Sequence, residues 1–182
     1  MGRAKGLRLR GCASGAAFTA LLVLNVLGCG STGMEHGAPH DHAAHQAANE
    51  RRDEVAGRGR EVMPFDLERT THRFQQLPDG GKQTVVADDA RDRRQVALIR
   101  VHLREEAARF RRSDFGDPSR IHGERMPGLA ELREGAGRIV VRYEREPAGA
   151  RLRYTTSEPR LVTALHTWFR AQVRDHGRHA EG

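Results

Sequence analysis

The sequence predicts an α+β domain in which two ββα units form a four-stranded, mainly antiparallel sheet with helices packed on one face. The first observation is a repeat, because a Pro-x-Gly turn between strand-like runs occurs in 74–80 and again in 143–149. The second is that apolar residues at helical spacing follow each turn. Each amphipathic helix needs a sheet to cover its apolar stripe, so we expect both units to share one sheet.

The strand-like runs predict two hairpins. Residues 70–77 and 82–87 form the first, and residues 138–145 and 151–156 form the second. The segment between the two units, 113–137, is predicted to be a loop with one short helix at 128–133.

A helix is predicted after each hairpin. Asp88 or Asp89 is the candidate N-cap of the first helix, which runs to about Arg112. Ser157 is the candidate N-cap of the second, which ends before Gly177. The apolar stripes that should face the sheet are Val96, Ile99, Leu103, Ala107 and Phe110 in the first helix, and Leu161, Leu165, Trp168 and Phe169 in the second.

The first 28 residues have the layout of a secretory signal, with a basic start, an apolar run over 16–27 and small residues beside Cys29. The apolar run is shorter than the roughly 20 residues that a membrane-spanning helix needs. Val26–Cys29 resembles a bacterial lipobox, which predicts cleavage before Cys29, lipidation of that cysteine and anchoring to a membrane of the cell envelope. The absence of aspartate after Cys29 favours the periplasmic side of the outer membrane in a Gram-negative cell. Ordinary secretion and an uncleaved anchor remain alternatives.

Removal of residues 1–28 changes the balance of charge. That segment carries four basic residues and no acidic one, so the net charge falls from +7 to +3. The remaining arginines alternate with acidic residues, which argues against nucleic-acid binding. Cys12 leaves with the signal and Cys29 is acylated, so no thiol remains for a disulfide or for thiolate chemistry.

Residues 29–60 are rich in Gly, Ala, His and charge and lack bulky apolar periodicity, which predicts a flexible tether. Residues 61–179 then form a single domain. Four histidines of the tether are candidate ligands for copper, nickel or zinc, because a flexible chain can wrap its ligands around an ion. A polar linker without metal is the alternative interpretation. These histidines are His36, His40, His42 and His45.

The predicted domain contains a second group of candidate metal ligands. His72 alternates with Phe74 on the first strand, so it should face the helices and need a partner there. His102 and Glu106 lie one helical turn apart and can reach one ion together, although an intrahelical hydrogen bond would explain the same spacing. His166, beside the apolar stripe of the second helix, is left undecided. His176 is interpreted as a cation at the end of that helix.

The connecting segment contains the strongest local signal for a metal site. His122 and Met126 flank a glycine turn, so an imidazole nitrogen and a thioether could meet at one point, which suits copper. The alternative is that the methionine fills a gap in the core.

Four segments together resemble those of a family of small, largely uncharacterised bacterial proteins, some of which carry the name aspartate carbamoyltransferase. These segments are Met63–Leu67, Thr71–Phe74, Ile121–Gly128 and Ala164–Gln172. A carbamoyltransferase of that fold needs two α/β domains of about twice this length and a Ser-Thr-Arg-Thr-type phosphate loop. The sequence has neither, so the resemblance implies the extent of the domain rather than that activity.

Three functional hypotheses follow. The favoured one is an envelope lipoprotein that binds a transition metal, copper before zinc, as a chaperone or scavenger that passes the ion to an envelope protein. The second is a metal-free module that binds a partner or ligand. The third is a small enzyme using His72, His102 and Glu106, although the sequence has no Gly-x-Ser-x-Gly, His-Glu-x-x-His, P-loop or haem-attachment motif.

Overall fold

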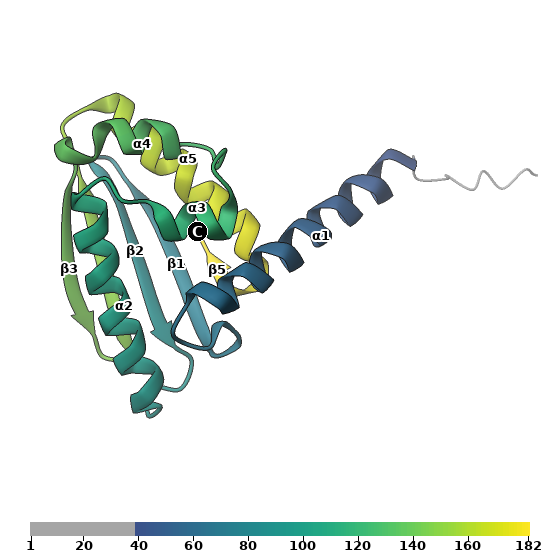
Figure 1. The fold of residues 1–182 in the computed structure, drawn as a ribbon, viewed down its shortest axis with the longest axis horizontal. Coiled ribbons are helices and arrows are strands. Elements are labelled where there is room, and N and C mark those ends of the chain that lie inside the picture. The colour runs from purple at the N-terminus through teal and green to yellow at the C-terminus, as the bar shows by residue number, and fades with distance from the viewer. Residues whose placement is uncertain (1–38) are drawn as a thin grey trace, which may run out of the picture. The chain divides into compact units, whose positions relative to one another are not determined.

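The computed structural model describes residues 39–182 (Figure 1). The predicted signal segment, the lipidation site Cys29 and the candidate ligand His36 therefore lie outside the described residues.

The described chain is an α+β fold built on a five-stranded mixed sheet. The strands are β1 (Thr70–Leu77), β2 (Gly80–Ala87), β3 (Val140–Glu146), β4 (Gly149–Thr155) and β5 (Ala180–Glu181). Their order across the sheet is β3-β4-β2-β1-β5, and every pair is antiparallel except β1 with β5. The α+β class is confirmed, but the predicted four-stranded sheet is wrong by one strand. The two residues of β5 are too few to show a strand period in the sequence.

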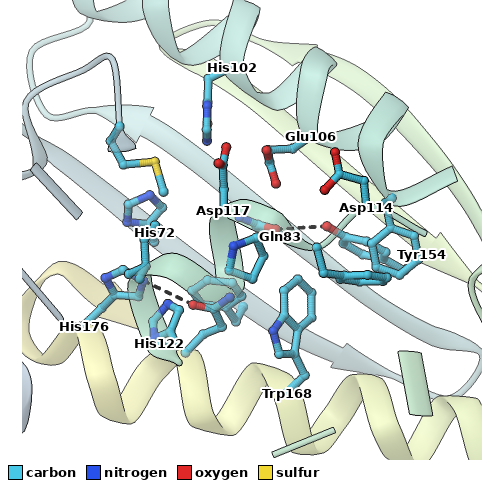
Figure 2. Close-up of a pocket in the computed structure, with 17 residues that line it drawn as sticks. His72, Gln83, His102, Glu106, Asp114, Asp117, His122, Tyr154, Trp168 and His176 are labelled. Carbon is cyan, nitrogen blue, oxygen red and sulfur yellow. Dashed lines mark hydrogen bonds between the residues drawn. The ribbon is translucent and has the colours of Figure 1, made fainter. Parts of the chain in front are cut away.

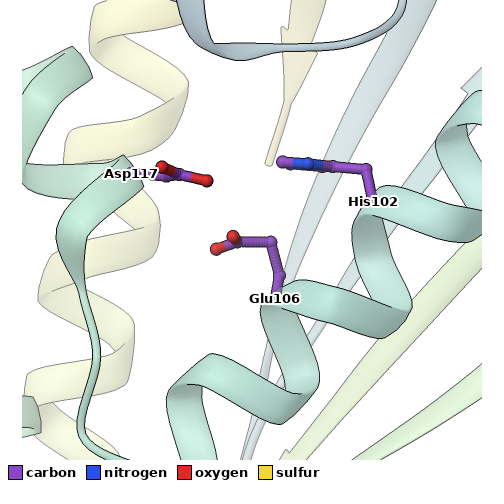
Figure 3. A group of neighbouring side chains, drawn as sticks. All are labelled: His102, Glu106 and Asp117. Carbon is purple, nitrogen blue, oxygen red and sulfur yellow. The ribbon is translucent and has the colours of Figure 1, made fainter.

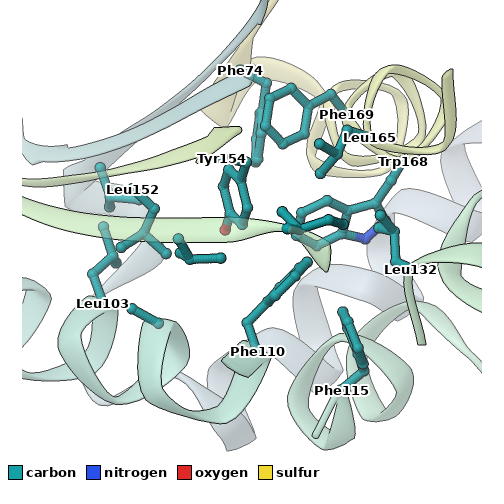
Figure 4. Close-up of a cluster of buried hydrophobic side chains, with 14 of the residues drawn as sticks. Phe74, Leu103, Phe110, Phe115, Leu132, Leu152, Tyr154, Leu165, Trp168 and Phe169 are labelled. Atoms are coloured by element: carbon teal, nitrogen blue, oxygen red, sulfur yellow. The ribbon is translucent and has the colours of Figure 1, made fainter. Parts of the chain in front are cut away.

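Two long helices cover one face of the sheet. They are α2 (Arg93–Arg111), which packs on β2, β3 and β4, and α5 (Pro159–His176), which packs on β1 and β2 (Figure 1). Their predicted apolar stripes are buried between helix and sheet, as Figure 4 shows for the aromatic part of the core. The labelled core residues are Phe74, Leu103, Phe110, Phe115, Leu132, Leu152, Tyr154, Leu165, Trp168 and Phe169.

The beginnings of both helices differ from the prediction. Asp92 is the N-cap of α2, where its side chain accepts a hydrogen bond from the backbone N–H of Gln95 at 3.1 Å. Asp89 instead closes a turn by accepting from the backbone N–H of Arg91. Glu158 precedes α5 without a side-chain cap, so Ser157 is not the cap. Several neighbouring aspartates satisfy the same capping rule, and only the turn geometry selects one of them.

The connecting segment contains two short helices, where one was predicted. These are α3 (Gly116–His122) and α4 (Leu129–Gly135). Gly123 and Gly128, at φ 88° and 84°, take the left-handed backbone conformations that end α3 and begin α4.

The prediction of a flexible tether is wrong for residues 39–60, which belong to α1 (Pro39–Val62). This helix packs against α3 and α5, and its Val55 is 1% exposed. Arg58 and Arg51 donate hydrogen bonds to the carbonyl oxygens of Ile121 and His122, each at 2.7 Å. The contact is therefore made by arginines and one valine, which gives no apolar periodicity for sequence reasoning to detect. The folded unit begins well before residue 61.

No helix within residues 39–182 is both long and apolar enough to cross a membrane.

Two glycines, one in the sheet and one on α1, allow a test of the packing described above. A methyl group at Gly149 would overlap the carbonyl oxygen of Val85 on β2, whereas one at Gly57 on α1 would meet nothing within 4 Å. We expect Gly149→Ala to lower the free energy of unfolding by about 1–3 kcal/mol through overpacking. Gly57→Ala should raise it by about 0.5–1 kcal/mol through helix propensity. Urea unfolding of both variants measures these changes, and equal effects would contradict the described packing.

Candidate metal centre

A small buried cavity lies between the sheet and the helices (Figure 2). Four elements each contribute one histidine to its wall, namely His72 from β1, His102 from α2, His122 from α3 and His176 from α5. Its volume of about 50 Å³ is enough for an ion with a few water molecules. Organic ligands usually occupy pockets of roughly 300–1,000 Å³, so this cavity is too small for them.

One end of the cavity gathers an imidazole and two carboxylates (Figure 3). His102, Glu106 and Asp117 each place one ligand atom within 4.8 Å of the other two. His102 and Glu106 come together because they lie one turn apart on α2, and Asp117 reaches them from the first turn of α3. These three atoms are close enough to hold one ion after small side-chain movements.

The charges at this end are arranged unfavourably in the absence of a cation. Burial, and then the negative charge of Asp117, raise the pKa of Glu106 to about 8. Arg109 pairs with Asp117 and lies 3.5 Å from Glu106, which offsets part of this repulsion. Burial lowers the pKa of His102, so its ring is neutral at pH 7 and keeps a lone pair for a metal.

The other end of the cavity is formed by three histidine rings. The ring centroid of His176 lies 5.2 Å from that of His72 and 5.0 Å from that of His122. His72 is 3% exposed, and its Nδ1 atom has no hydrogen-bond partner. Burial, and then the charge of His102, lower the pKa of His72 to about 4. Burial also holds the pKa of His176 well below its ordinary value. Both rings are therefore neutral at pH 7.

Two hydrogen bonds fix His122 and His176. His122 Nδ1 lies 3.0 Å from Oδ2 of Asp175, and His176 Nε2 lies 3.2 Å from Oε1 of Gln172. Arg51 donates to the same Asp175 oxygen at 2.7 Å. Burial by itself would raise the pKa of Asp175, but the bonds from His122 and Arg51 hold it below its ordinary value. A carboxylate that accepts from one imidazole nitrogen leaves the other nitrogen with its lone pair.

The structure brings together most of the domain residues selected from the sequence. His72, His102, Glu106 and His122 all line the cavity. Met126 does not, because it is 4% exposed in the hydrophobic core. His122 and Met126 instead line a second pocket together, while most of the methionine side chain packs in the core. Metal binding by this pair stays a prediction.

Sequence reasoning missed three residues of this region. Asp117 and Asp175 were not selected, because an aspartate in a loop or in a last helical turn usually faces solvent. His176 was interpreted as a cation at the end of α5, but its buried ring is neutral. Only the packing of separate elements reveals these residues, and no local motif marks them.

The other histidines lie apart from the cavity wall. His166, undecided from the sequence, places Nε2 within 3.0 Å of the carbonyl oxygens of Leu77 and Gly80, so it holds the β1–β2 turn against α5. His42 and His45 are exposed on α1. His40 also lies on α1, and metal binding by the histidines of the predicted tether remains a prediction.

No family model, curated protein or solved structure matches the chain. The geometry and chemistry of the cavity therefore provide the evidence for function.

The neutral buried imidazoles predict acid sensitivity in the metal-free protein. His72 has a folded-state pKa of about 4 against an ordinary value of 6.5, so folding favours its neutral form. Its contribution to stability is complete above pH 6.5 and is lost as the pH falls toward 4. Protonation of His72 should lower the free energy of unfolding by up to about 3 kcal/mol.

Thermal unfolding between pH 7.5 and pH 4, in the presence of a chelator, measures this effect. The variant His72→Phe should lose less stability over that range than the parent protein. The prediction is contradicted if the two proteins lose the same amount.

Proposed function

We propose that this protein binds one divalent transition-metal ion between α2 and α3, through His102, Glu106 and Asp117. The observation that carries the proposal is the convergence of three ligand atoms within 4.8 Å in a buried cavity. We further propose that it acts at the surface of an envelope membrane, to which the lipid predicted on Cys29 would tether it, and that it passes the ion to another envelope protein.

The ligand set favours a particular class of metal. One imidazole nitrogen with two carboxylate oxygens suits zinc, manganese or ferrous iron better than soft monovalent copper. Three protein ligands leave a position for water. The cavity of about 50 Å³ has no room for an organic substrate beside the ion, which favours holding or delivery of metal over catalysis.

Charge provides a driving force for binding. A cation between Glu106 and Asp117 would offset the burial and the repulsion by Asp117 that keep a proton on Glu106. Asp117 still pairs with Arg109, so the ion would have to share that carboxylate or displace the guanidinium. Asp114 is exposed and lines the same cavity, which provides an acidic entrance for a cation.

Zinc titration of neighbouring glutamate variants tests the proposal. The protein should carry glutamine at His36, His40, His42 and His45, so that those histidines bind no metal. We expect the parent to bind one equivalent of Zn²⁺ and to melt at a higher temperature when loaded. Glu106→Gln should weaken binding by about 100-fold, because it removes a charged ligand.

Glu105→Gln is the matched control, since Glu105 lies next to Glu106 on α2 but is exposed. It should leave zinc affinity within about twofold, a difference well under 1 kcal/mol. The proposal is wrong if both variants bind like the parent or if both lose binding equally.

The affinity should also depend on pH. The carboxyl group of Glu106, with a pKa of about 8, must lose its proton to bind the ion. Affinity should therefore rise by about tenfold per pH unit from pH 6.5 to pH 8 and then level off. Calorimetry in two buffers of different ionisation enthalpy should detect about one proton released per ion at pH 7. No proton release at pH 7 would argue against Glu106 as a ligand.

A further inference from the structure

The histidine end of the cavity has the features of a separate metal site. It is made of His72, His122 and His176, which come from three different elements, and the ring of His176 lies beside those of the other two (Figure 2). We propose that these three histidines form a second metal centre that takes a monovalent copper ion. This inference goes beyond the divalent site at His102, Glu106 and Asp117 and does not depend on it.

The spacing of the rings fits a shared ion. With a metal to nitrogen distance of 2.0–2.1 Å, two imidazoles at angles of about 110–120° have ring centroids roughly 5–5.5 Å apart. The two measured separations, 5.2 Å for His72 with His176 and 5.0 Å for His122 with His176, lie in that range. His176 is the shared neighbour, so an ion bound to it can take a second ligand from either of the other rings. The ring nitrogens of all three do not lie within 4.8 Å of one another, so an ion held by all three requires the rings to turn toward it.

Each ring has a nitrogen available for a metal. In the tautomer that donates Nδ1–H to Asp175, His122 keeps a lone pair on Nε2. In the tautomer that donates Nε2–H to Gln172, His176 keeps a lone pair on Nδ1. His72 has a buried Nδ1 without a hydrogen-bond partner, and a metal would satisfy this atom. Ligating histidines are commonly held in this way by a second hydrogen bond to a carboxylate or carbonyl oxygen.

The net charge of the site selects the ion. Imidazole ligands bring no negative charge to the site, and the nearby carboxylate of Asp175 is already paired with Arg51 at 2.7 Å. The cost of burying an ion without opposite charge rises with the square of its charge, so a divalent ion is penalised about four times as strongly as a monovalent one. Monovalent copper also accepts two or three nitrogen ligands. The other end of the cavity contains the acidic groups of Glu106 and Asp117, which can supply negative charge to a divalent ion.

The test is anaerobic titration of the full chain with Cu(I), in competition with a chromophoric Cu(I) chelator. The chain again carries glutamine at His36, His40, His42 and His45. We expect one equivalent of Cu(I) to bind, with X-ray absorption showing two or three nitrogen neighbours from imidazoles. Glu106→Gln should leave this affinity within about twofold.

His72→Phe is the principal variant, because it removes a ligand and an unsatisfied buried nitrogen while keeping a ring beside Phe65 and Phe74. It should melt at or above the temperature of the parent and bind Cu(I) about tenfold more weakly. His176→Gln, which removes the shared ligand, should lower Cu(I) affinity by about 100-fold while Zn²⁺ binding is retained.

Three outcomes would overturn the proposal. The first is Cu(I) affinity that is unchanged in both histidine variants. The second is loss of Cu(I) binding in Glu106→Gln, which would place copper at the carboxylate end. The third is an absorption spectrum dominated by sulfur, which would assign the copper to cysteine or methionine. Failure of Zn²⁺ binding alone would reject the divalent site and leave the copper site standing.

Discussion

The hydrogen bond between Asp175 and His122 is the interaction on which the arrangement of the helices depends. It joins the last turn of α5 to the end of α3, and both side chains are 2% exposed. Arg51 of α1 donates to the same carboxylate, so three helices meet at one oxygen atom. A buried carboxylate is costly unless it is paired, which means that removing any one of these groups would leave the others unsatisfied.

The position of α1 depends on further hydrogen bonds at the same end of α3. The carbonyl oxygens at the end of α3 have no partners within that helix, and arginines of α1 supply them. Positive charge at the C-terminal end of a helix is also favourable for its dipole. α1 is thereby part of the wall behind His122, although its composition is that of a polar linker.

The cavity combines two chemical environments within a small volume. At one end the acidic groups of Glu106 and Asp117 lie close together, and at the other end imidazoles lie among aromatic rings. In the first environment one guanidinium, that of Arg109, faces both acidic groups, and in the second the Nδ1 atom of His72 has no hydrogen-bond partner. Both conditions arise from burial, because water would otherwise screen the carboxylates and hydrogen-bond the imidazoles. An ion of suitable charge would relieve each of them.

Sequence alone determined the α+β class, the two hairpins and the apolar stripes of α2 and α5. Local hydrophobic periodicity and the residue types in the turns are sufficient to predict these features. It also placed His72 on the inner face of its strand and His102 one turn from Glu106. Tertiary structure decided the rest. Asp117 and His176 line the cavity, and Asp175 hydrogen-bonds His122, only because α2, α3 and α5 come together there from distant parts of the chain. The helix at 39–62 and the two-residue strand β5 are held by arginine hydrogen bonds and by an available sheet edge, which leave no periodic pattern in the sequence.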